Sequence, residues 1–383
     1  MTVPLDYEVL RLIWWLLLGV LLVGFAITGG YDLGVAMLLP VVGRQDIERR
    51  VMINSIAPFW EGNQVWLLLG VGAVFAAWPP IYAAAFSGFY IALFLVLATL
   101  ILRPVGFDFR NKFANPRWRA LWDSGLFAAG LVPSVVFGVA FGNLLQGVPF
   151  RLDDDLRVLY EGSGLFELLN PFGLLCGVLS AAMLATHGAI YLTLKTDGIV
   201  WTRARDLARM GALTTIILFA AAGLWVWLGI DGYAIVGTVS TDGPSNPLLK
   251  DVVREPGRWL ANYRTHTWMI AAPALGFLGP LLALFLTVAK RTGSAFVASA
   301  CGMVGIIATP GVSMFPFLMP SSIAPAASLT VWDASSSRLT LFVMLLVTLI
   351  LMPIVLVYTA VAFRAMRGTV TASWVEKNSA NLY

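Results

Sequence analysis

The chain of 383 residues is 59% hydrophobic and only 12% charged, about half the charged share of an average soluble domain. This composition excludes a soluble globular protein and indicates an integral membrane protein. The formal net charge of +4, and two cysteines placed in apolar runs, give no sign of nucleic-acid binding, a disulfide framework or a cysteine metal site.

Nine apolar segments are long enough to cross about 30 Å of hydrocarbon as helices. They lie near residues 10–40, 53–78, 80–102, 121–146, 164–194, 207–229, 267–289, 295–318 and 338–366. We therefore expect an all-α integral membrane protein in which residues 1–383 form a single membrane domain. The N-terminal segment lacks a basic region and a small-residue cleavage site, so we expect no signal peptide to be removed.

Basic residues are distributed unevenly between the two sides that these helices define. One side carries 17 of the 25 Lys and Arg residues, and the other side carries 8. Because loops rich in Lys and Arg stay in the cytoplasm, this bias predicts an N-terminus outside and a cytoplasmic C-terminus.

The first segment contains Thr28 and Asp32, which are four residues apart and share one helix face. Glycines flank them, so helices or water can approach the backbone closely. A buried Asp32 would be functional, whereas an Asp32 at a solvated helix end would be structural, and the residues alone leave both interpretations open. The Gly30-x-x-x-Gly34 spacing is typical of closely packed membrane helices.

The second segment carries a carboxylate, Glu61, in its first half, together with the amides Asn54, Asn63 and Gln64. A carboxylate at membrane depth costs about 2.5–3.5 kcal/mol unless it faces protein or water. Helical spacing places Glu61 on the same flank as Pro58 and Gln64, and we expect this flank to face inward toward other helices. Glu61 is therefore a candidate functional residue, with a purely structural role as the alternative.

Three charged residues, Arg103, Asp108 and Asp123, lie where the third segment ends and the fourth begins. Arg103 precedes a proline at the predicted cytoplasmic boundary, where basic side chains usually reach toward lipid phosphates. Asp108 lies among aromatic residues at the same edge and would suit the mouth of a proton path. Asp123 begins a helix, where a negative charge can also serve only the helix dipole.

The chain contains two histidines, His187 inside the fifth segment and His266 at the outer edge of the seventh. A single buried histidine is more often a hydrogen-bonded structural residue than a haem or metal ligand. The sequence contains no phosphate-binding loop, dinucleotide fingerprint, zinc-protease motif or nucleophile elbow. We therefore expect this chain to ligate no haem and no metal, and to share any chemistry with a partner.

Ten stretches of the chain resemble subunit II of the cytochrome bd-type quinol oxidases. They occur in the order of that family, and the resemblance as a whole runs from DYEVLRLIWW at residue 6 to the C-terminal tail. The stretches are GRQDIERRVMINSIAPFWEGNQVWL, FAAWPPIYAAAFSGFY, RPVGFDFRNK, FGNLLQGVPF, LLNPFGLL, GIDGY, SNPL, VVREPGRWL, MFPFLMPSS and ASLTVWDASSS. On these motifs the chain is identified as a member of that family.

The resemblance implies two four-helix bundles plus one peripheral helix, paired with a subunit I that holds haems b and d and the quinol-oxidising loop. It implies a complex of the bacterial inner membrane that oxidises quinol and reduces oxygen to water with cytoplasmic protons, without pumping. This chain would support assembly of subunit I and contribute a cytoplasmic proton path. A small single-span subunit is a further expected partner, and Trp60 would contact a structural quinone in members that hold one.

The resemblance also assigns roles to five charged positions. Asp108 would be the cytoplasmic entrance of the proton path, Glu61 the relay within the membrane, and Asp32 a further acid near the interface. Arg103 and Asp123 would support the environment of the haem site. These roles are expectations carried over from the family.

Two positions depart from the family pattern. Some members have an acid where this chain has Gly29, so a relay there must use Asp32 or water. Glu61 stands where some members have aspartate, which keeps the charge and lengthens the side chain by a single methylene.

Three other functions would also explain buried acids in a multi-span protein. A proton-coupled membrane transporter should show broken helices paired in inverted repeats, and none is recognisable in the sequence. A redox subunit that binds haem by itself would need more His or Met at axial positions. A purely structural scaffold subunit, with no part in proton transfer, is the alternative within the family.

Overall fold

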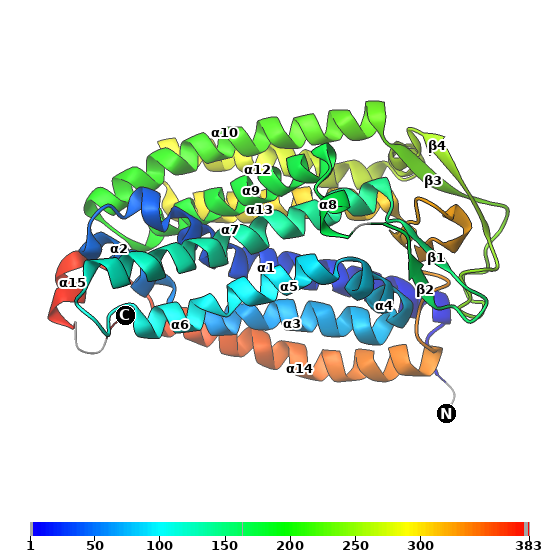
Figure 1. Ribbon diagram of the computed structural model, residues 1–383, viewed down its shortest axis with the longest axis horizontal. Coiled ribbons are helices and arrows are strands. Elements are labelled where there is room, and N and C mark those ends of the chain that lie inside the picture. Colours follow the sequence, from blue (N-terminus) through cyan, green and yellow to red (C-terminus); the bar gives the residue numbers. More distant parts are fainter. Residues whose placement is uncertain (1–2, 163, 379–381, 383) are drawn as a thin grey trace.

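The computed structural model describes residues 3–162, 164–378 and 382, which form long helices that run side by side along one axis (Figure 1). Within these residues, eight helical stretches are long and apolar enough to span a membrane. They are α1 (Tyr7–Val42), α5 with α6 (Tyr90–Leu100 and Leu102–Phe109), α7 (Pro116–Gln146), α9 (Pro171–Lys195), α10 (Gly198–Gly229), η2 with α12 (Thr267–Ile270 and Ala271–Val288), α13 (Thr292–Met314) and α14 (Arg338–Ala365). The expected all-α membrane fold is confirmed.

The apolar segments expected at 53–78 and 80–102 are each divided into shorter helices. These helices are α2 (Asp46–Ile56), α3 (Trp60–Ala77), α4 (Pro79–Gly88), α5 and α6. The first division falls at a turn around Pro58, because proline lacks the N–H that a continuous helix requires and its ring clashes with the preceding turn. Glu61 consequently lies in the first turn of α3, where a negative charge suits the helix dipole.

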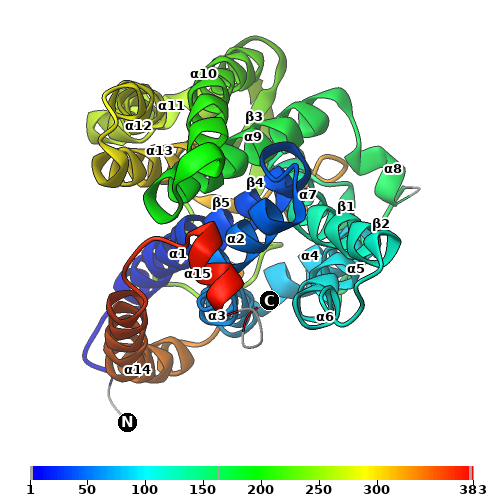
Figure 2. The ribbon, with the colours of Figure 1, turned by 90° about the vertical axis from the view of Figure 1, so that its left-hand side faces the viewer.

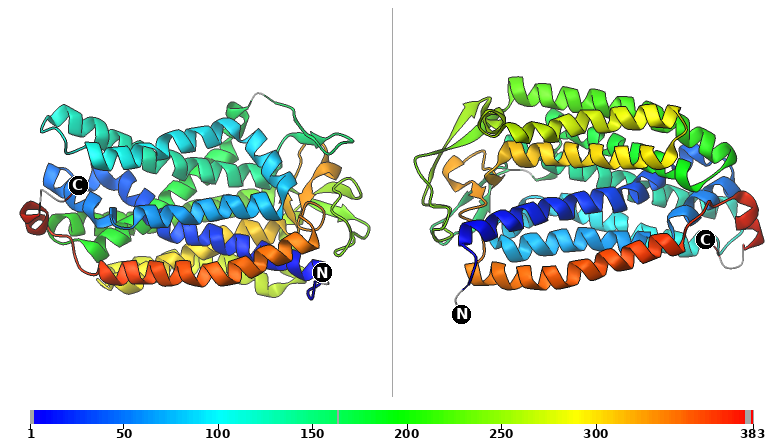
Figure 3. Two further views of the ribbon diagram at one scale, coloured as in Figure 1. Left: turned by 90° about the horizontal axis from the view of Figure 1, so that it is seen from below. Right: turned by 180° about the vertical axis from the view of Figure 1, so that it is seen from behind.

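The helices are arranged as two four-helix bundles and one peripheral helix (Figure 2). The first bundle contains α1, α3, α7 and the row formed by α4, α5 and α6, and the second contains α9, α10, α12 and α13. Helices α1, α7 and α9 pack against one another and join the two bundles. Helix α14 lies outside them, against α1 and α3 (Figure 3).

The close contact between α1 and α9 depends on glycine. A Cβ atom added to Gly34 would meet the backbone oxygen of Leu184 and lie 2.9 Å from the Cα of Gly188. A Cβ atom at Gly30 would lie 2.7 Å from the side chain of Leu184. The Gly30-x-x-x-Gly34 spacing therefore lies at a close helix crossing, as its pattern predicts.

Three short antiparallel hairpins cover one end of the bundles, which we call the hairpin end (Figure 1). They pair β1 (Phe150–Leu152) with β2 (Val158–Tyr160), β3 (Asp231–Val236) with β4 (Asp251–Pro256), and β5 (Phe317–Met319) with β6 (Leu329–Thr330). The opposite end, called the α2 end, carries α2 and α15 (Ala372–Lys377), which contact each other. The remaining short elements are α8 (Leu165–Leu168), α11 (Ala261–Thr265), η1 (Arg258–Leu260) and η3 (Pro325–Ala327).

Buried charges hold the hairpin end together. Arg11 is fully buried on α1 and donates hydrogen bonds at 2.6–3.0 Å to loops that come from distant parts of the chain. Its acceptors are the carbonyl groups of Thr241 and Gly243 and the hydroxyl groups of Ser245 and Ser335. Lys250 and Asp333 form a second buried contact, with Nζ 2.8 Å from Oδ2. These contacts tie the loops to the start of α1.

Candidate functional site

Asp32 is fully buried on α1 and is held by a residue of α3. The side-chain amide of Asn63 donates one hydrogen bond to Asp32 Oδ2 at 2.9 Å and a second to the hydroxyl of Tyr31 at 2.7 Å. Asn63 itself is only 2% exposed. The structure thus places Asp32 inside the first bundle, and the interpretation of this acid as a solvated helix end is wrong.

Arg103 is the positive charge that acts on Asp32. It is 2% exposed on α6, and its Nη1 donates to Oε1 of Gln64 at 3.2 Å. The expectation that Arg103 extends toward lipid phosphates is therefore wrong, because its guanidinium group is enclosed by the first bundle.

Some polar atoms around Asp32 and Arg103 lack a hydrogen-bond partner within the described part of the chain. We call these two residues, together with Tyr31, Asn63 and Gln64, the Asp32–Arg103 cluster. Among the described residues, Asp32 Oδ1 and the Nε and Nη2 atoms of Arg103 are buried without a hydrogen-bond partner. Buried polar atoms are normally hydrogen-bonded, and ordered water commonly bridges such groups. The cluster therefore offers one acceptor, Asp32 Oδ1, and two donors, on Arg103, which are the groups that an ordered water needs as partners.

Glu61 does not face the inside of the chain. Its side chain is exposed, in contrast to the expectation of an inward-facing flank. At about 100° per residue, Glu61 and Asn63 lie about 200° apart around α3, so burial of Asn63 turns Glu61 outward. Val65 and Leu68, which follow Glu61 at helical spacing, are 38% and 66% exposed.

Asp108 is exposed near the C-terminal end of α6, at the α2 end of the molecule. It is five residues beyond Arg103 and lies outside the Asp32–Arg103 cluster. The neighbouring Phe109 is 49% exposed, so the carboxylate lies beside an aromatic surface. Within the described residues, Asp108 has no hydrogen bond or ion pair, which leaves it accessible from outside this chain.

Asp123 belongs to a separate ionic network at the α2 end. Its carboxylate lies 2.6 Å from Nε of Arg110 and 2.8 Å from Nη1 of Arg49. Asp46 extends the network by pairing with Arg110 at 2.8 Å and Arg119 at 2.9 Å. Burial lowers the pKa of Arg110, but hydrogen bonds and charges of the two aspartates outweigh burial and raise that pKa above its ordinary value. Asp123 and Arg103 therefore have different partners, and their expected support of the haem site stays a prediction.

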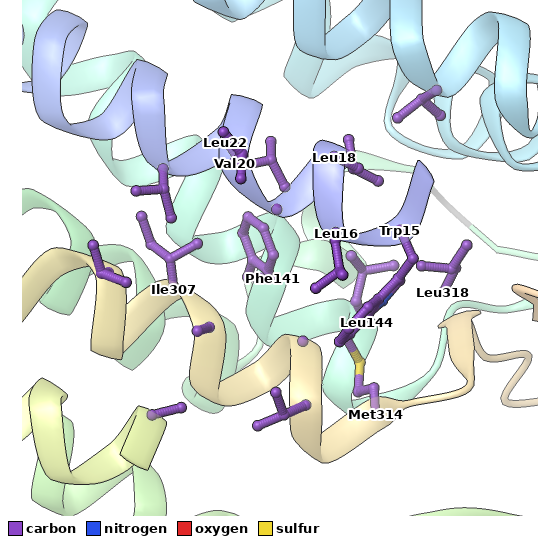
Figure 4. A pocket seen from close by; sticks show the side chains of 18 of the residues that line it. Trp15, Leu16, Leu18, Val20, Leu22, Phe141, Leu144, Ile307, Met314 and Leu318 are labelled. Carbon is purple, nitrogen blue, oxygen red and sulfur yellow. The ribbon is translucent and has the colours of Figure 1, made fainter. Parts of the chain in front are cut away.

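Trp60 is partly buried at the start of α3, and its ring packs edge-on against Phe107 with centroids 5.6 Å apart. An apolar cavity of about 730 Å³ lies nearer the hairpin end, between α1, α3, α7, α12 and α13 (Figure 4). Trp15, Trp66 and Trp78 line that cavity, whereas Trp60 is not one of its lining residues.

His187 is fully buried on α9, with both ring nitrogens occupied. Its Nε2 lies 3.1 Å from the carbonyl oxygen of Ile27, which can only accept, so Nε2 carries the proton. Its Nδ1 then accepts from the hydroxyl of Ser299 at 3.0 Å. His266 is exposed at the hairpin end. The part of the chain that the structure describes contains no group of three or more His, Cys, Asp and Glu residues that could hold a metal ion.

The acids of this site stand out in the sequence, but the residues that hold them do not. Asn63 and Gln64 are amides near Glu61 in the sequence, and in the structure they bond to Asp32 and Arg103. The available signal was the spacing of Asn63, which is two positions beyond Glu61 and therefore lies about 200° away around the helix.

Known proteins match almost the whole length of this chain. The family model described as "Cytochrome bd terminal oxidase subunit II" matches residues 10–366. Cytochrome bd-I ubiquinol oxidase subunit 2 of Escherichia coli (strain K12) is 55% identical over 379 residues, which cover 99% of this chain and 100% of the relative. Cytochrome bd ubiquinol oxidase subunit 2 of Bacillus subtilis (strain 168) is 33% identical over 346 residues, which cover 90% of this chain and 92% of the relative.

A solved structure gives the same architecture. A chain in the structure of bd oxidase from Geobacillus thermodenitrificans matches with a TM-score of 0.68, and the match covers 93% of this chain and 98% of that chain. The sequence identity is only 16%, so this likeness concerns the fold alone.

Proposed function

Since the chain belongs to the subunit II family of cytochrome bd terminal oxidases, and is thus a subunit of an inner-membrane oxidoreductase complex, we propose that it supplies a proton path to the oxygen-reducing site. We also propose that it supports assembly of the haem-bearing subunit I. In this division of labour, subunit I oxidises quinol and reduces oxygen, while this chain ligates no haem.

The observation that carries the proposal is the position of Glu61. It is an exposed carboxylate on a helix face whose next members, Val65 and Leu68, are exposed and apolar. A carboxylate that faced lipid at membrane depth would cost about 2.5–3.5 kcal/mol. We therefore infer that a protein partner covers this face of α3, and subunit I is the partner that the family provides.

The three acids then have distinct roles. Asp108, exposed at the α2 end, receives protons from the cytoplasm. Glu61 passes them along the contact with subunit I. Asp32 takes up and releases a proton inside the first bundle, where the positive charge of Arg103 offsets the negative charge of the ionised form. Carboxylates can relay protons when water or hydroxyl groups lie within reach, and the unpartnered atoms of the Asp32–Arg103 cluster fit bound water.

We propose supporting roles for two further residues. Asp123, fixed by Arg49 and Arg110, would hold α7 rigidly near the haem environment of subunit I. Trp60 would contact the head group of a structural quinone, because its ring is partly exposed and already packs against Phe107.

The distribution of basic residues sets the proposed orientation. The α2 end carries the arginines of the Asp123 network and belongs in the cytoplasm, so the N-terminus lies outside and the C-terminus inside. Protons taken up from the cytoplasm would make quinol oxidation electrogenic without pumping. A small single-span subunit would complete the complex.

The test uses Glu61→Gln in the complete complex, with haem content and quinol-driven oxygen consumption as the measurements. The substitution keeps the size and removes the ionisable group, so we expect normal haem content and oxygen consumption lowered about tenfold or more. The control is Glu255→Gln, which alters an exposed carboxylate on β4 and should leave turnover unchanged. Full turnover at full haem content in Glu61→Gln would refute the proton path and leave a scaffold role.

A further inference from the structure

The amide of Asn63 lies between a carboxylate oxygen of Asp32 and the phenolic oxygen of Tyr31. Asn63 lies on the buried face of α3, and the two N–H bonds of its single amide nitrogen go to different acceptors, Asp32 Oδ2 and the hydroxyl of Tyr31. The same helix turn carries Glu61 on its outer face. The polar contact between α3 and the acid on α1 therefore passes through one amide group.

A carboxamide has a property that this position can use. An ionised carboxylate only accepts hydrogen bonds, whereas a protonated carboxyl group also donates one. The amide of asparagine has a donor side and an acceptor side, and a half-turn about its Cβ–Cγ bond exchanges the two. Asparagine can therefore form a hydrogen bond with either form of a neighbouring carboxyl group.

We propose that Asn63 is a positioning residue that holds Asp32 in both its ionised and its protonated form through a half-turn of the Asn63 amide. In the ionised form, Nδ2 donates to Asp32 Oδ2, as the structure shows. When a proton binds at Asp32 Oδ2, the amide oxygen accepts the resulting O–H, and the hydroxyl of Tyr31 changes from acceptor to donor. The proton stays on the carboxyl group, and no covalent bond to the amide forms.

The other polar groups around Asp32 have fixed partners, and the amide oxygen of Gln64 accepts from Nη1 of Arg103 at 3.2 Å. Tyr191, stacked on Tyr31 with ring centroids 4.0 Å apart, donates its hydroxyl proton to the carbonyl of Ser55 at 2.7 Å. Both nitrogens of His187 have fixed partners. Arg103 has only donors and stays positively charged. Among these groups of α1, α6 and α9, Tyr31 alone can follow the amide when it turns.

This inference rests on the proposed proton path, and Asn63→Leu in the complete complex tests it. Leucine has nearly the same size and no hydrogen-bonding group. We expect normal haem content, turnover lowered about tenfold, and a pH dependence of turnover whose midpoint moves by about one pH unit. We also expect the carboxyl stretching band that disappears in Asp32→Asn to shift in redox difference infrared spectra.

A matched control is available on α7. Asn143 is 7% exposed, and its amide also donates two hydrogen bonds, at 2.8 Å each, to the carbonyls of Val139 and Leu168. Asn143→Leu removes these two hydrogen bonds, and a third that Asn143 accepts from the amide of Asn170 at 2.9 Å, from a site where no acid side chain is bonded to the amide. It should leave the pH midpoint and the carboxyl band unchanged, whereas equal changes in both variants would overturn the proposal.

A second pair of variants applies if Asn63→Leu fails to assemble. Asn63→Ser and Asn63→Ala leave similar space, but only serine keeps a group that both donates and accepts. The proposal predicts a near-normal pH midpoint for Ser and a shifted one for Ala, and identical midpoints would overturn it. Asp32→Asn distinguishes a failure of the proton path from a failure of the role of Asn63. Full turnover in Asp32→Asn would refute the proton path. Slow turnover in Asp32→Asn together with normal turnover in Asn63→Leu would refute only the role of Asn63.

Discussion

Two buried acid–base pairs in this molecule differ in whether the two charged groups touch. We call a pair closed when it forms a direct ion pair and open when it does not. At the hairpin end, Asp333 Oδ2 lies 2.8 Å from Nζ of Lys250 in a direct ion pair that lacks hydrogen-bond geometry, and Asp333 Oδ1 accepts from the backbone N–H of Thr330 at 2.9 Å. In the first bundle, Asp32 and Arg103 attract each other without a direct ion pair and keep unpartnered buried atoms. A closed pair fixes loops in place, whereas an open pair leaves polar atoms for water and for a moving proton.

The ionic network at the α2 end belongs with the closed pair. Asp123 contacts two arginines, and Glu48 accepts hydrogen bonds from the backbone N–H groups of Arg44 and Gln45 and from Arg203. Both carboxylates are consequently bound to fixed donors. Under the proposed proton path, Asp32 is therefore the buried acid that we expect to exchange a proton.

The largest effect on stability should follow from opening the closed pair. Lys250→Met leaves the buried carboxylate of Asp333 without its counter-charge, which typically costs about 3–5 kcal/mol. We expect a clear fall in the thermal midpoint of the purified complex. Oxygen consumption per haem should stay normal in the molecules that assemble, because this pair takes no part in proton transfer.

The double variant Lys250→Met with Asp333→Leu sharpens this test. Replacing both charges with apolar groups removes the unpaired charge, so most of the lost stability should return. A thermal midpoint as low as that of Lys250→Met alone would show that the ion pair is not the cause of the loss.

A smaller and pH-dependent effect is expected at Glu48. Burial raises the pKa of Glu48, but the hydrogen bonds from Gln45, Arg44 and Arg203 outweigh burial and lower this pKa below its ordinary value. Its ionised form therefore stabilises the fold above the unfolded-state pKa of about 4.3, and this contribution is lost as the pH falls through the lower folded-state pKa.

Glu48→Gln should accordingly be less stable than the natural protein by about 1–2 kcal/mol at pH 7. The difference in thermal midpoint should shrink as the pH falls below about 4. A difference that stayed constant across this pH range would mean that the charge of Glu48 does not contribute.

Much of the fold follows from local properties of the sequence. Apolar length predicted the eight long membrane spans of the described residues, and glycine spacing predicted the close crossing at Gly34. The ninth expected segment, 53–78, is divided between α2 and α3 and is not among those spans. The sequence did not reveal the turn at Pro58, because an apolar stretch that contains a proline can be a kinked helix or two helices.

The candidate site could be predicted only in part. The acids stand out because charge is rare in this composition, but which side of α3 faces inward depends on contacts with α1. Glu61 was therefore placed on the wrong side, and the contact from Asn63 to Asp32 joins residues 31 positions apart in the chain. Such partners are set by tertiary packing, which no local pattern encodes.

The central claim, that the open pair around Asp32 carries protons, is tested most directly by the voltage that one turnover generates. The complete complex is reconstituted in vesicles, and the natural protein is compared with Asp32→Asn. The account predicts unchanged electron arrival at the haems and a charge movement slowed about 100-fold, as expected when a proton-transfer group is removed. Charge movement at the natural rate in Asp32→Asn would contradict it.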